Sequence, residues 1–187
     1  MTVIRQNSRS AIIEAAFVVF SADPSASLDA VAKQAGVGRA TLHRQFKGRD
    51  DLMAALASAA VGELNTAVDA ATKDSASYAD ALQGAIRALV PLGHRHWFLS
   101  HFDFSRTAKL RQMFEDDRRE IMAAIDGAKA EGVFAPDIPS AWIAEAFDTL
   151  IYTAWMLIRN EAATPTQAAD FIWRMLTTGL NGDQNEP

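Results

Sequence analysis

The sequence of 187 residues contains no cysteine, six prolines and two tyrosines. The lack of cysteine excludes disulfide scaffolds, thiolate zinc sites, iron–sulfur clusters and cysteine nucleophiles. The rest of the composition, with 49% hydrophobic and 22% charged residues, is typical of a folded globular protein and not of a disordered one. A reducing compartment suits such a chain, and we expect a cytoplasmic protein.

Long uncharged apolar runs are also lacking. The most apolar segment, 142–158, carries Glu145 and Asp148, whereas a membrane-spanning helix needs about 20 mostly apolar residues. The first apolar stretch contains Glu14 and precedes no small-residue cleavage site, so we expect neither a secretory signal nor a membrane segment.

Alternating β-branched runs bounded by turns are missing too, while apolar residues recur three and four positions apart through most of the chain. The sequence therefore predicts an all-α fold. Ser27 is a good helix N-cap, Gly36 ends the helix that follows it, and Pro165 is suited to a helix start. With such signals the expected helices span about 8–21, 28–35, 40–46, 50–72, 78–90, 107–131, 140–161 and 166–180, with a short aromatic piece at 94–104.

Charge is distributed unevenly. The formal net charge is −5, yet residues 1–49 hold seven Lys or Arg against three Asp or Glu, a surplus of +4 that leaves −9 for the remainder. A basic N-terminal quarter on an acidic protein suggests that this quarter meets a polyanion. Chance clustering of charges on a solvated face explains the same surplus.

The two short helices at about 28–35 and 40–46 are joined by a glycine-containing connection, an arrangement typical of a helix-turn-helix. Helical spacing directs Leu42 and Phe46 inward. It directs Arg44 and Lys47 outward, flanked by Thr41 and His43, where a guanidinium can reach a guanine edge and an ammonium a phosphate. A solvated surface helix has the same polarity, so the pattern alone leaves both interpretations open.

The order of residues in this segment favours DNA binding over a solvated surface helix. The stretch LDAVAKQAGVGRATLHRQF at 28–46, followed by Arg49-Asp50-Asp51-Leu52, resembles the N-terminal DNA-binding region of TetR-family transcriptional regulators. The resemblance covers roughly residues 8–56. It departs at His43, where the family usually has tyrosine, in the shorter connection from Phe20 to Leu28, and at Gly48, which replaces a polar cap.

The resemblance implies a three-helix DNA-binding domain at 1–49 and a larger helical domain at 50–187 for ligand binding and dimerisation. It implies a homodimeric regulator, a repressor of operator DNA released by a largely apolar effector, with no catalysis and no cofactor. The implied DNA contacts are Ser27, Thr41, His43, Arg44 and Lys47, with Arg5 and Arg9 on an N-terminal arm.

Aromatic residues gather in the second half of the chain, where they can line an apolar cavity or simply fill a core. We take as candidate pocket residues Trp97, Phe98, His101, Phe102, Phe114, Trp142, Phe147 and Tyr152. The last two helices carry more apolar residues than one buried stripe needs, which predicts a dimer interface. Its candidate residues are Ile151, Trp155, Ile158, Ala168, Ile172, Met175 and Gly179.

Two other functions stay open from the residues alone. Histidines at 94, 96 and 101 together with Asp103 suggest a helical metal-dependent enzyme. On a helix, however, His94 and His101 would lie about 10 Å apart, too far for one ion, and His96 would point elsewhere. A helical adaptor without a DNA role is the second alternative. The sequence therefore favours a regulator, and no metal site is expected.

Overall fold

The computed structural model describes residues 2–103 and 108–180, with side chains from residue 8 onward, and throughout this part of the chain every regular element is helical. The prediction of an all-α fold is thereby confirmed. No helix in the described part is long and apolar enough to cross a membrane. The elements are α1 (Thr2–Ala22), α2 (Leu28–Gln34), α3 (Arg39–Gln45), α4 (Arg49–Thr72), α5 (Tyr78–Leu89), the 3-10 turn η1 (Val90–Leu92), α6 (Gly93–Ser100), α7 (Ala108–Ala130), α8 (Ser140–Arg159) and α9 (Pro165–Thr177).

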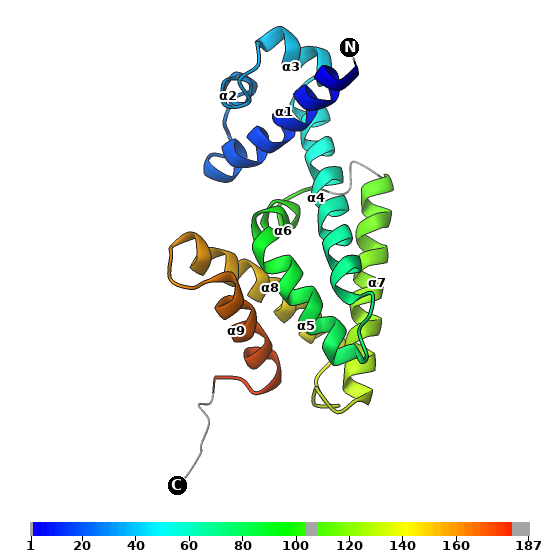
Figure 1. Cartoon of the computed structure of the whole chain (residues 1–187). Coiled ribbons are helices and arrows are strands. Elements are labelled where there is room, and N and C mark those ends of the chain that lie inside the picture. Colours follow the sequence, from blue (N-terminus) through cyan, green and yellow to red (C-terminus); the bar gives the residue numbers. More distant parts are fainter. Residues whose placement is uncertain (1, 104–107, 181–187) are drawn as a thin grey trace.

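Helices α1 to α3 form a unit at one end of the molecule, which we call the reading head after the DNA contact that the sequence resemblance predicts for it (Figure 1). The Ser27 hydroxyl accepts a hydrogen bond from the Ala30 amide and so caps α2 as predicted. Gly36, with φ of +65°, reverses the chain after α2, and the Val37 amide donates to the Ala32 carbonyl. Helix α1 begins at residue 2, six residues before its expected start.

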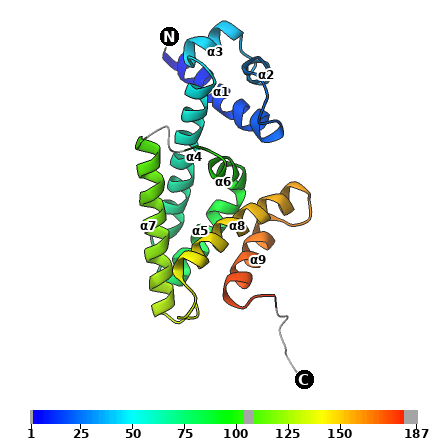
Figure 2. The ribbon, with the colours of Figure 1, turned by 180° about the vertical axis from the view of Figure 1, so that it is seen from behind.

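Helix α4 runs out of the reading head into the rest of the protein (Figures 1 and 2). Its first turn carries Asp50 and Asp51, where the helix dipole favours acidic side chains. It packs on α1 at its beginning and on α5, α6 and α7 further along. A single continuous cluster of buried apolar side chains therefore extends from α1 to α9.

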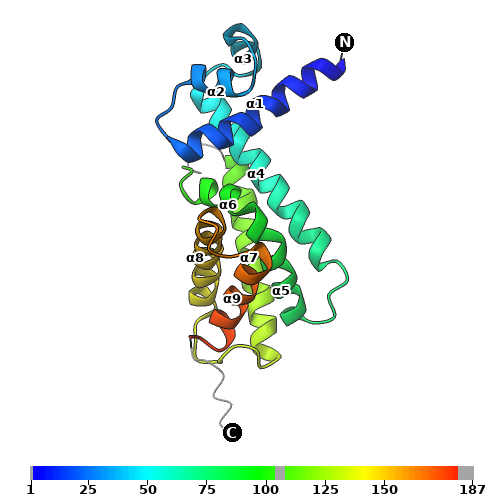
Figure 3. The same ribbon diagram turned by 60° about the vertical axis from the view of Figure 1, so that its left-hand side comes forward.

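The remaining helices form the larger unit, described over residues 50–103 and 108–180, which we call the effector region after the ligand binding that the sequence resemblance predicts for it. Helices α8 and α9 pack side by side, and α6 lies between α4 and α8 and also contacts α1 (Figure 3). Thr164 and Gln167 form a reciprocal capping box at the start of α9, with Pro165 in its first turn. The expected aromatic piece at 94–104 is shorter than predicted, because α6 ends at Ser100.

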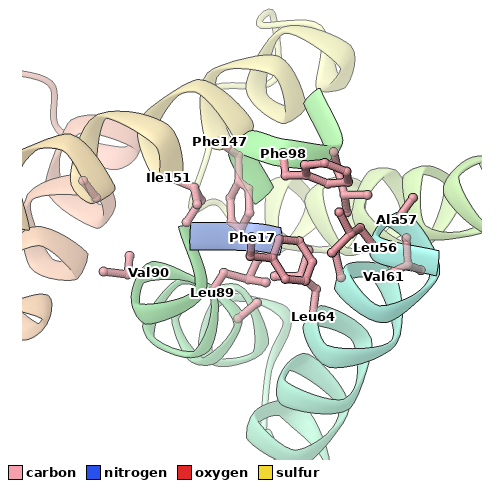
Figure 4. Packing of buried hydrophobic residues seen from close by; sticks show 14 of the residues in the cluster. Phe17, Leu56, Ala57, Val61, Leu64, Leu89, Val90, Phe98, Phe147 and Ile151 are labelled. Atoms are coloured by element: carbon pink, nitrogen blue, oxygen red, sulfur yellow. The ribbon is translucent and has the colours of Figure 1, made fainter. Parts of the chain in front are cut away.

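Phe17 of α1 lies where the two units meet. Its ring is 1% exposed and packs edge-on against Phe98 of α6 at a centroid distance of 5.4 Å. Figure 4 shows this pair among aliphatic side chains of α4, including Leu56 and Leu64. The reading head is thus joined to α6 by packed rings, not by a bare linker.

Candidate DNA interface and effector cavity

Helix α3 presents two contrasting faces. Leu42 is 1% exposed and Phe46 is fully buried, so the inner face anchors the helix to the reading-head core. Of the residues expected to meet DNA, His43, Arg44 and Lys47 are exposed, and Thr41 is half-buried. This arrangement leaves a small cationic face free to enter a DNA groove.

Ser27 is exposed at the start of α2, and its oxygen is already used as a cap. Its hydroxyl hydrogen can still be donated to a phosphate, because a hydroxyl is both donor and acceptor. Arg5 lies where side chains are outside the described residues, so the structure places no contact for it.

Arg9 does not extend from the protein as an arm. Its guanidinium donates to the Gln45 carbonyl at 3.1 Å and lies 4.4 Å from the centre of the Phe46 ring. The side chain therefore ties α1 to the C-terminal end of α3, where a cation complements the helix dipole. Arg9 is nevertheless exposed and stays a predicted DNA contact, held against α3.

Two further arginines, Arg39 of α3 and Arg49 at the start of α4, have structural roles that sequence reasoning did not assign. Arg49 donates to the carbonyls of Ala26 and Pro24 and lies 4.5 Å from the centre of the Phe20 ring, so it fastens the turn between α1 and α2. Arg39 pairs with Asp29 at 3.3 Å across α2 and α3. Both roles depend on contacts between different elements, so no sequence motif indicates them.

A cavity of about 960 Å³ opens between α4, α5, α6, α7 and α8. Aromatic and aliphatic side chains form most of its wall, and polar groups are interspersed among them. Such a mixture is typical of a small-molecule site. Of the candidate pocket residues, the cavity is lined by Trp97, His101, Phe114, Phe147 and Tyr152.

The other three candidate pocket residues do not line this cavity. Phe98 is turned to the opposite side of α6, where it packs on Phe17, and the Phe102 ring lies tilted against Phe98 at a centroid distance of 6.0 Å. Trp142 is 70% exposed on the first turn of α8. These corrections have one cause, since aromatic residues close in sequence point in different directions on a helix.

The described lining of the cavity is strongly acidic. It includes five carboxylates, at positions 69, 117, 120, 145 and 148, and one arginine, Arg118, which pairs with Glu145 at 2.8 Å. Burial raises the pKa of the Asp148 carboxyl; nearby His96, whose Nε2 lies 3.7 Å from it, opposes this rise, and Glu145 adds to it.

Asp117 on α7 is a second perturbed acid in the same wall. Burial raises the pKa of its carboxyl, the hydrogen bond from the Asn65 amide at 2.9 Å opposes this, and the neighbouring carboxylates of Glu120, Asp116 and Asp69 add to the rise. A cavity that concentrates carboxylates in this way favours a cationic occupant, which would relieve their mutual repulsion.

The histidines of α6 are engaged separately. The His94 ring packs edge-on against Phe17 at 6.4 Å, and burial followed by the charge of Arg95 lowers its pKa. The Nδ1 of His101, the residue after α6, lies within hydrogen-bond distance of the Trp97 carbonyl oxygen, at 2.9 Å, and of the Ser100 hydroxyl oxygen, at 3.0 Å. Within the described residues, no group of three or more His, Asp or Glu is placed to hold a metal ion.

The candidate dimer residues divide into two groups. Ile151, Ala168 and Ile172 are at most 2% exposed within a single chain, so they belong to the core between α8 and its neighbours. The prediction that they lie at an interface is therefore corrected. When a helix is apolar on all sides, its sequence does not show which face packs within its own chain. Trp155 and Ile158 are half-buried, Met175 is 39% exposed, and Gly179 has φ of +73° after α9.

Residues 12–56 match the family model described as "Bacterial regulatory proteins, tetR family". Along its whole length the chain is 30% identical over 186 residues to the HTH-type transcriptional regulator NfxB of Pseudomonas aeruginosa, covering 97% of each protein. It is 29% identical over 178 residues to the HTH-type transcriptional repressor LfrR of Mycolicibacterium smegmatis, covering 94% of this chain and 92% of LfrR.

Among solved structures, LfrR in complex with proflavine superposes with a TM-score of 0.79 at 27% identity, covering 96% of this chain and 99% of LfrR. The MbdR regulator from Azoarcus has a TM-score of 0.74 at 21% identity, covering 94% and 100%, and so shares the fold.

A helix-turn-helix with exposed cations on its second helix is the architecture of a DNA-binding protein, and the helical region behind it contains a cavity. The family model and the two relatives place the chain in one family of DNA-binding regulators. The protein belongs to the tetR family of bacterial transcriptional regulators and is not an enzyme.

Proposed function

We propose that the protein is a homodimeric repressor that binds operator DNA through α3 and releases it when an aromatic cation occupies the effector cavity. The carrying observation is the cavity itself, whose wall combines aromatic rings with five carboxylates. In this proposal residues 1–49 read DNA, and residues 50–187 bind the effector and dimerise. The start of α4 at Arg49 supports this division.

The DNA-binding part of the proposal is supported by two exposed cations, Arg44 in the last turn of α3 and Lys47 just after it. Arg44 can fork onto a guanine edge, whereas Lys47 is suited to a phosphate. Selection of duplexes from a random pool should enrich a two-fold symmetric site, with half-sites about 34–36 Å apart or a multiple of that distance. Failure to enrich any sequence at moderate salt would contradict the proposal.

The two cations should be distinguishable by substitution. We expect Arg44→Ala to weaken specific binding by about 1–3 kcal/mol and to relax the base preference, whereas Lys47→Ala should weaken all sequences evenly. Binding of each variant to the selected site and to unrelated DNA, measured by fluorescence anisotropy over a range of salt concentrations, separates these effects.

The effector part rests on charge and shape. A flat cation can stack on Trp97, Phe147 or Tyr152 while its charge is met by Asp148 or Asp117. LfrR has been crystallised with proflavine, a planar aromatic cation. Proflavine is therefore the probe of choice for this chain as well.

Fluorescence titration of the protein with proflavine tests binding, and a second titration in the presence of the selected operator tests release. We expect saturable binding at one site per chain and weaker operator binding at saturation, because ligand and DNA affinities must be coupled reciprocally. Binding without any change in operator affinity would show that the cavity is not the regulatory site.

Dimerisation through α8 and α9 is supported by the apolar side chains that a single chain leaves uncovered there. Phe171 and Met175 are 47% and 39% exposed on α9, and Ile158 of α8 is only half-buried. We expect Met175→Glu to give monomers with poor operator affinity, and Ala123→Glu on the exposed face of α7 to leave the dimer intact. Light scattering at micromolar concentration measures both.

A further inference from the structure

Arg95 on α6 is the one charged side chain that is buried in the described part of the protein, at 5% exposure. Its Nη2 donates to both carboxylate oxygens of Glu14 at 2.8 Å, and its Nε donates to Glu63 at 2.8 Å. The guanidinium also lies 3.7 Å from the centre of the Phe17 ring. We call this group of Arg95, Glu14, Glu63 and Phe17 the Arg95 junction.

The Arg95 junction joins three helices at one point. Glu14 and Phe17 belong to α1 of the reading head, Glu63 belongs to α4, and Arg95 itself belongs to α6. Glu14 and Arg95 are 81 positions apart in the sequence. A single planar guanidinium with several fixed donors can hold two carboxylates and a ring in one geometry.

Helix α6 also forms part of the wall of the effector cavity. It contributes His96, Trp97, Leu99 and Ser100 to the lining, whereas neither Arg95 nor its two carboxylate partners line it. Residues adjacent in the sequence therefore serve two different surfaces of the same short helix. A ligand that displaces α6 must carry Arg95 with it.

The buried charge of Arg95 restricts how α6 can shift relative to α1 and α4. Only the arginine is buried here, and separating its guanidinium from both carboxylates at once would leave an uncompensated buried charge, which is strongly unfavourable, so Arg95 tends to keep at least one partner and to move with it. A purely apolar contact between α6 and α1 has no directional bonds and would allow the two helices to slide by small amounts. The junction thus has the physical character required for transmitting a displacement between two rigid elements.

We propose that Arg95 is the positioning residue through which occupation of the effector cavity changes the placement of the reading head. The proposal rests on the proposed function, since it concerns how that cavity acts on DNA binding. It assigns the route to the Arg95 junction in addition to the continuous helix α4.

The test measures a coupling factor, the ratio of operator dissociation constants with and without saturating proflavine, for the full-length protein and its variants. In regulated proteins such factors are typically about 5–150. We expect Glu14→Gln and Glu63→Gln each to reduce the factor about threefold or more, because each loosens one arm of the junction while leaving Arg95 one full carboxylate partner. Asp170→Asn, which removes the exposed pair with Arg87 on α5 and α9, is the matched control and should leave the factor unchanged.

Variants of Arg95 itself extend the test. Arg95→Met removes the charge but keeps an apolar stem against Phe17, and both carboxylates are partly exposed, at 56% and 40%, so they can be solvated. We expect its coupling factor to approach one, and Arg95→Lys to fall between it and the unmodified protein, since lysine keeps the charge without the fork. Proflavine affinity in the absence of DNA should stay within about twofold in all variants, because the cavity wall is unchanged.

The outcomes separate the two proposals. A protein that binds proflavine and releases DNA, but whose Glu14→Gln, Glu63→Gln and Arg95→Met variants keep the full coupling factor, would overturn the role of Arg95 alone. Lower melting temperatures with an unchanged factor would show a purely structural role and would overturn it equally. If the unmodified protein fails to bind proflavine or keeps its operator affinity when saturated, the proposed function fails first.

Discussion

The reading head and the effector region are both helical, but their side chains are densely packed in the first and leave a cavity in the second. In the reading head, Phe46, Phe20 and Phe17 are buried or nearly so, and each ring is covered by an arginine, namely Arg9, Arg49 and Arg95. In the effector region, the helices leave a cavity of about 960 Å³ between them.

The difference follows from what each region must do. A recognition helix has to hold its side chains in fixed positions against DNA, so dense packing behind α3 is an advantage. A ligand site needs unfilled volume, and the missing contacts lower the stability of its walls. The acidic lining adds to this, because Asp148 and Asp117 are held where burial disfavours their charged forms.

The largest expected effect compares one phenylalanine from each region. Phe46→Ala should lower the free energy of unfolding by about 3–5 kcal/mol, because the fully buried ring also supports Arg9. Phe147→Ala should cost less, about 2 kcal/mol, because Phe147, although 3% exposed, borders the cavity, so the space that its ring leaves opens onto the cavity and does not form a sealed void. Urea unfolding followed by circular dichroism measures both.

Equal losses of unfolding free energy for Phe46→Ala and Phe147→Ala would contradict this difference, because they would mean that the effector region is as densely packed in solution as the reading head. Proflavine titration of the Phe147→Ala variant adds an independent readout. Its affinity should fall even though the fold is less disturbed.

A smaller effect is expected for Asp148→Asn. Because interactions with a charged group are worth roughly 1.5–3 kcal/mol, proflavine affinity at neutral pH should fall about ten- to hundredfold. Asp137→Asn makes the same change of net charge at an exposed position outside the cavity and should leave the affinity unchanged. Fluorescence titration compares the two variants.

The pH dependence of this variant has a defined sign. Since the pKa of Asp148 is raised, the carboxylate forms only at higher pH than an ordinary aspartate, and proflavine binding should weaken as the pH falls through that raised value. A raised acidic pKa contributes stability below the unfolded pKa and loses it as the pH rises through the folded one. Asp148→Asn should therefore raise the melting temperature of the ligand-free protein at neutral pH, with the gain vanishing in acid. The neighbouring ionisable side chains His96, Glu145 and Arg118 remain in both proteins.

Helix positions were predictable because their signals are local. The cap at Ser27, the reversal at Gly36 and the proline at the start of α9 all act within a few residues, and the observed helices begin close to the expected positions. The inward placement of Leu42 and Phe46 also follows from helical periodicity alone. Only α1 extends well beyond its expected start.

The cavity wall and the Arg95 junction depend instead on which elements meet. Aromatic composition indicated Trp97 and Phe147 as pocket residues, but it equally indicated Trp142, which is exposed. Arg95 lies in an aromatic segment without any motif, and its partner Glu14 comes from a distant helix. The carboxylates of the wall come from three helices, so no short stretch of sequence reveals that they converge.

The smallest expected effect concerns the caps of the two regions. Ser27→Ala should cost about 1 kcal/mol of stability, because the Ala30 amide loses its acceptor, and Thr164→Ala should cost a similar amount at the start of α9. If Ser27 also donates to a phosphate, only Ser27→Ala should weaken operator binding beyond what its lower stability explains. Ser27→Asp sharpens the distinction, because aspartate is an equally good cap but repels phosphate and has no proton to donate. We expect it to preserve the melting temperature and to weaken DNA binding, as measured by thermal unfolding and fluorescence anisotropy on the same samples. Unchanged DNA binding by Ser27→Asp would limit Ser27 to its structural role, the same role that Thr164 has in the effector region.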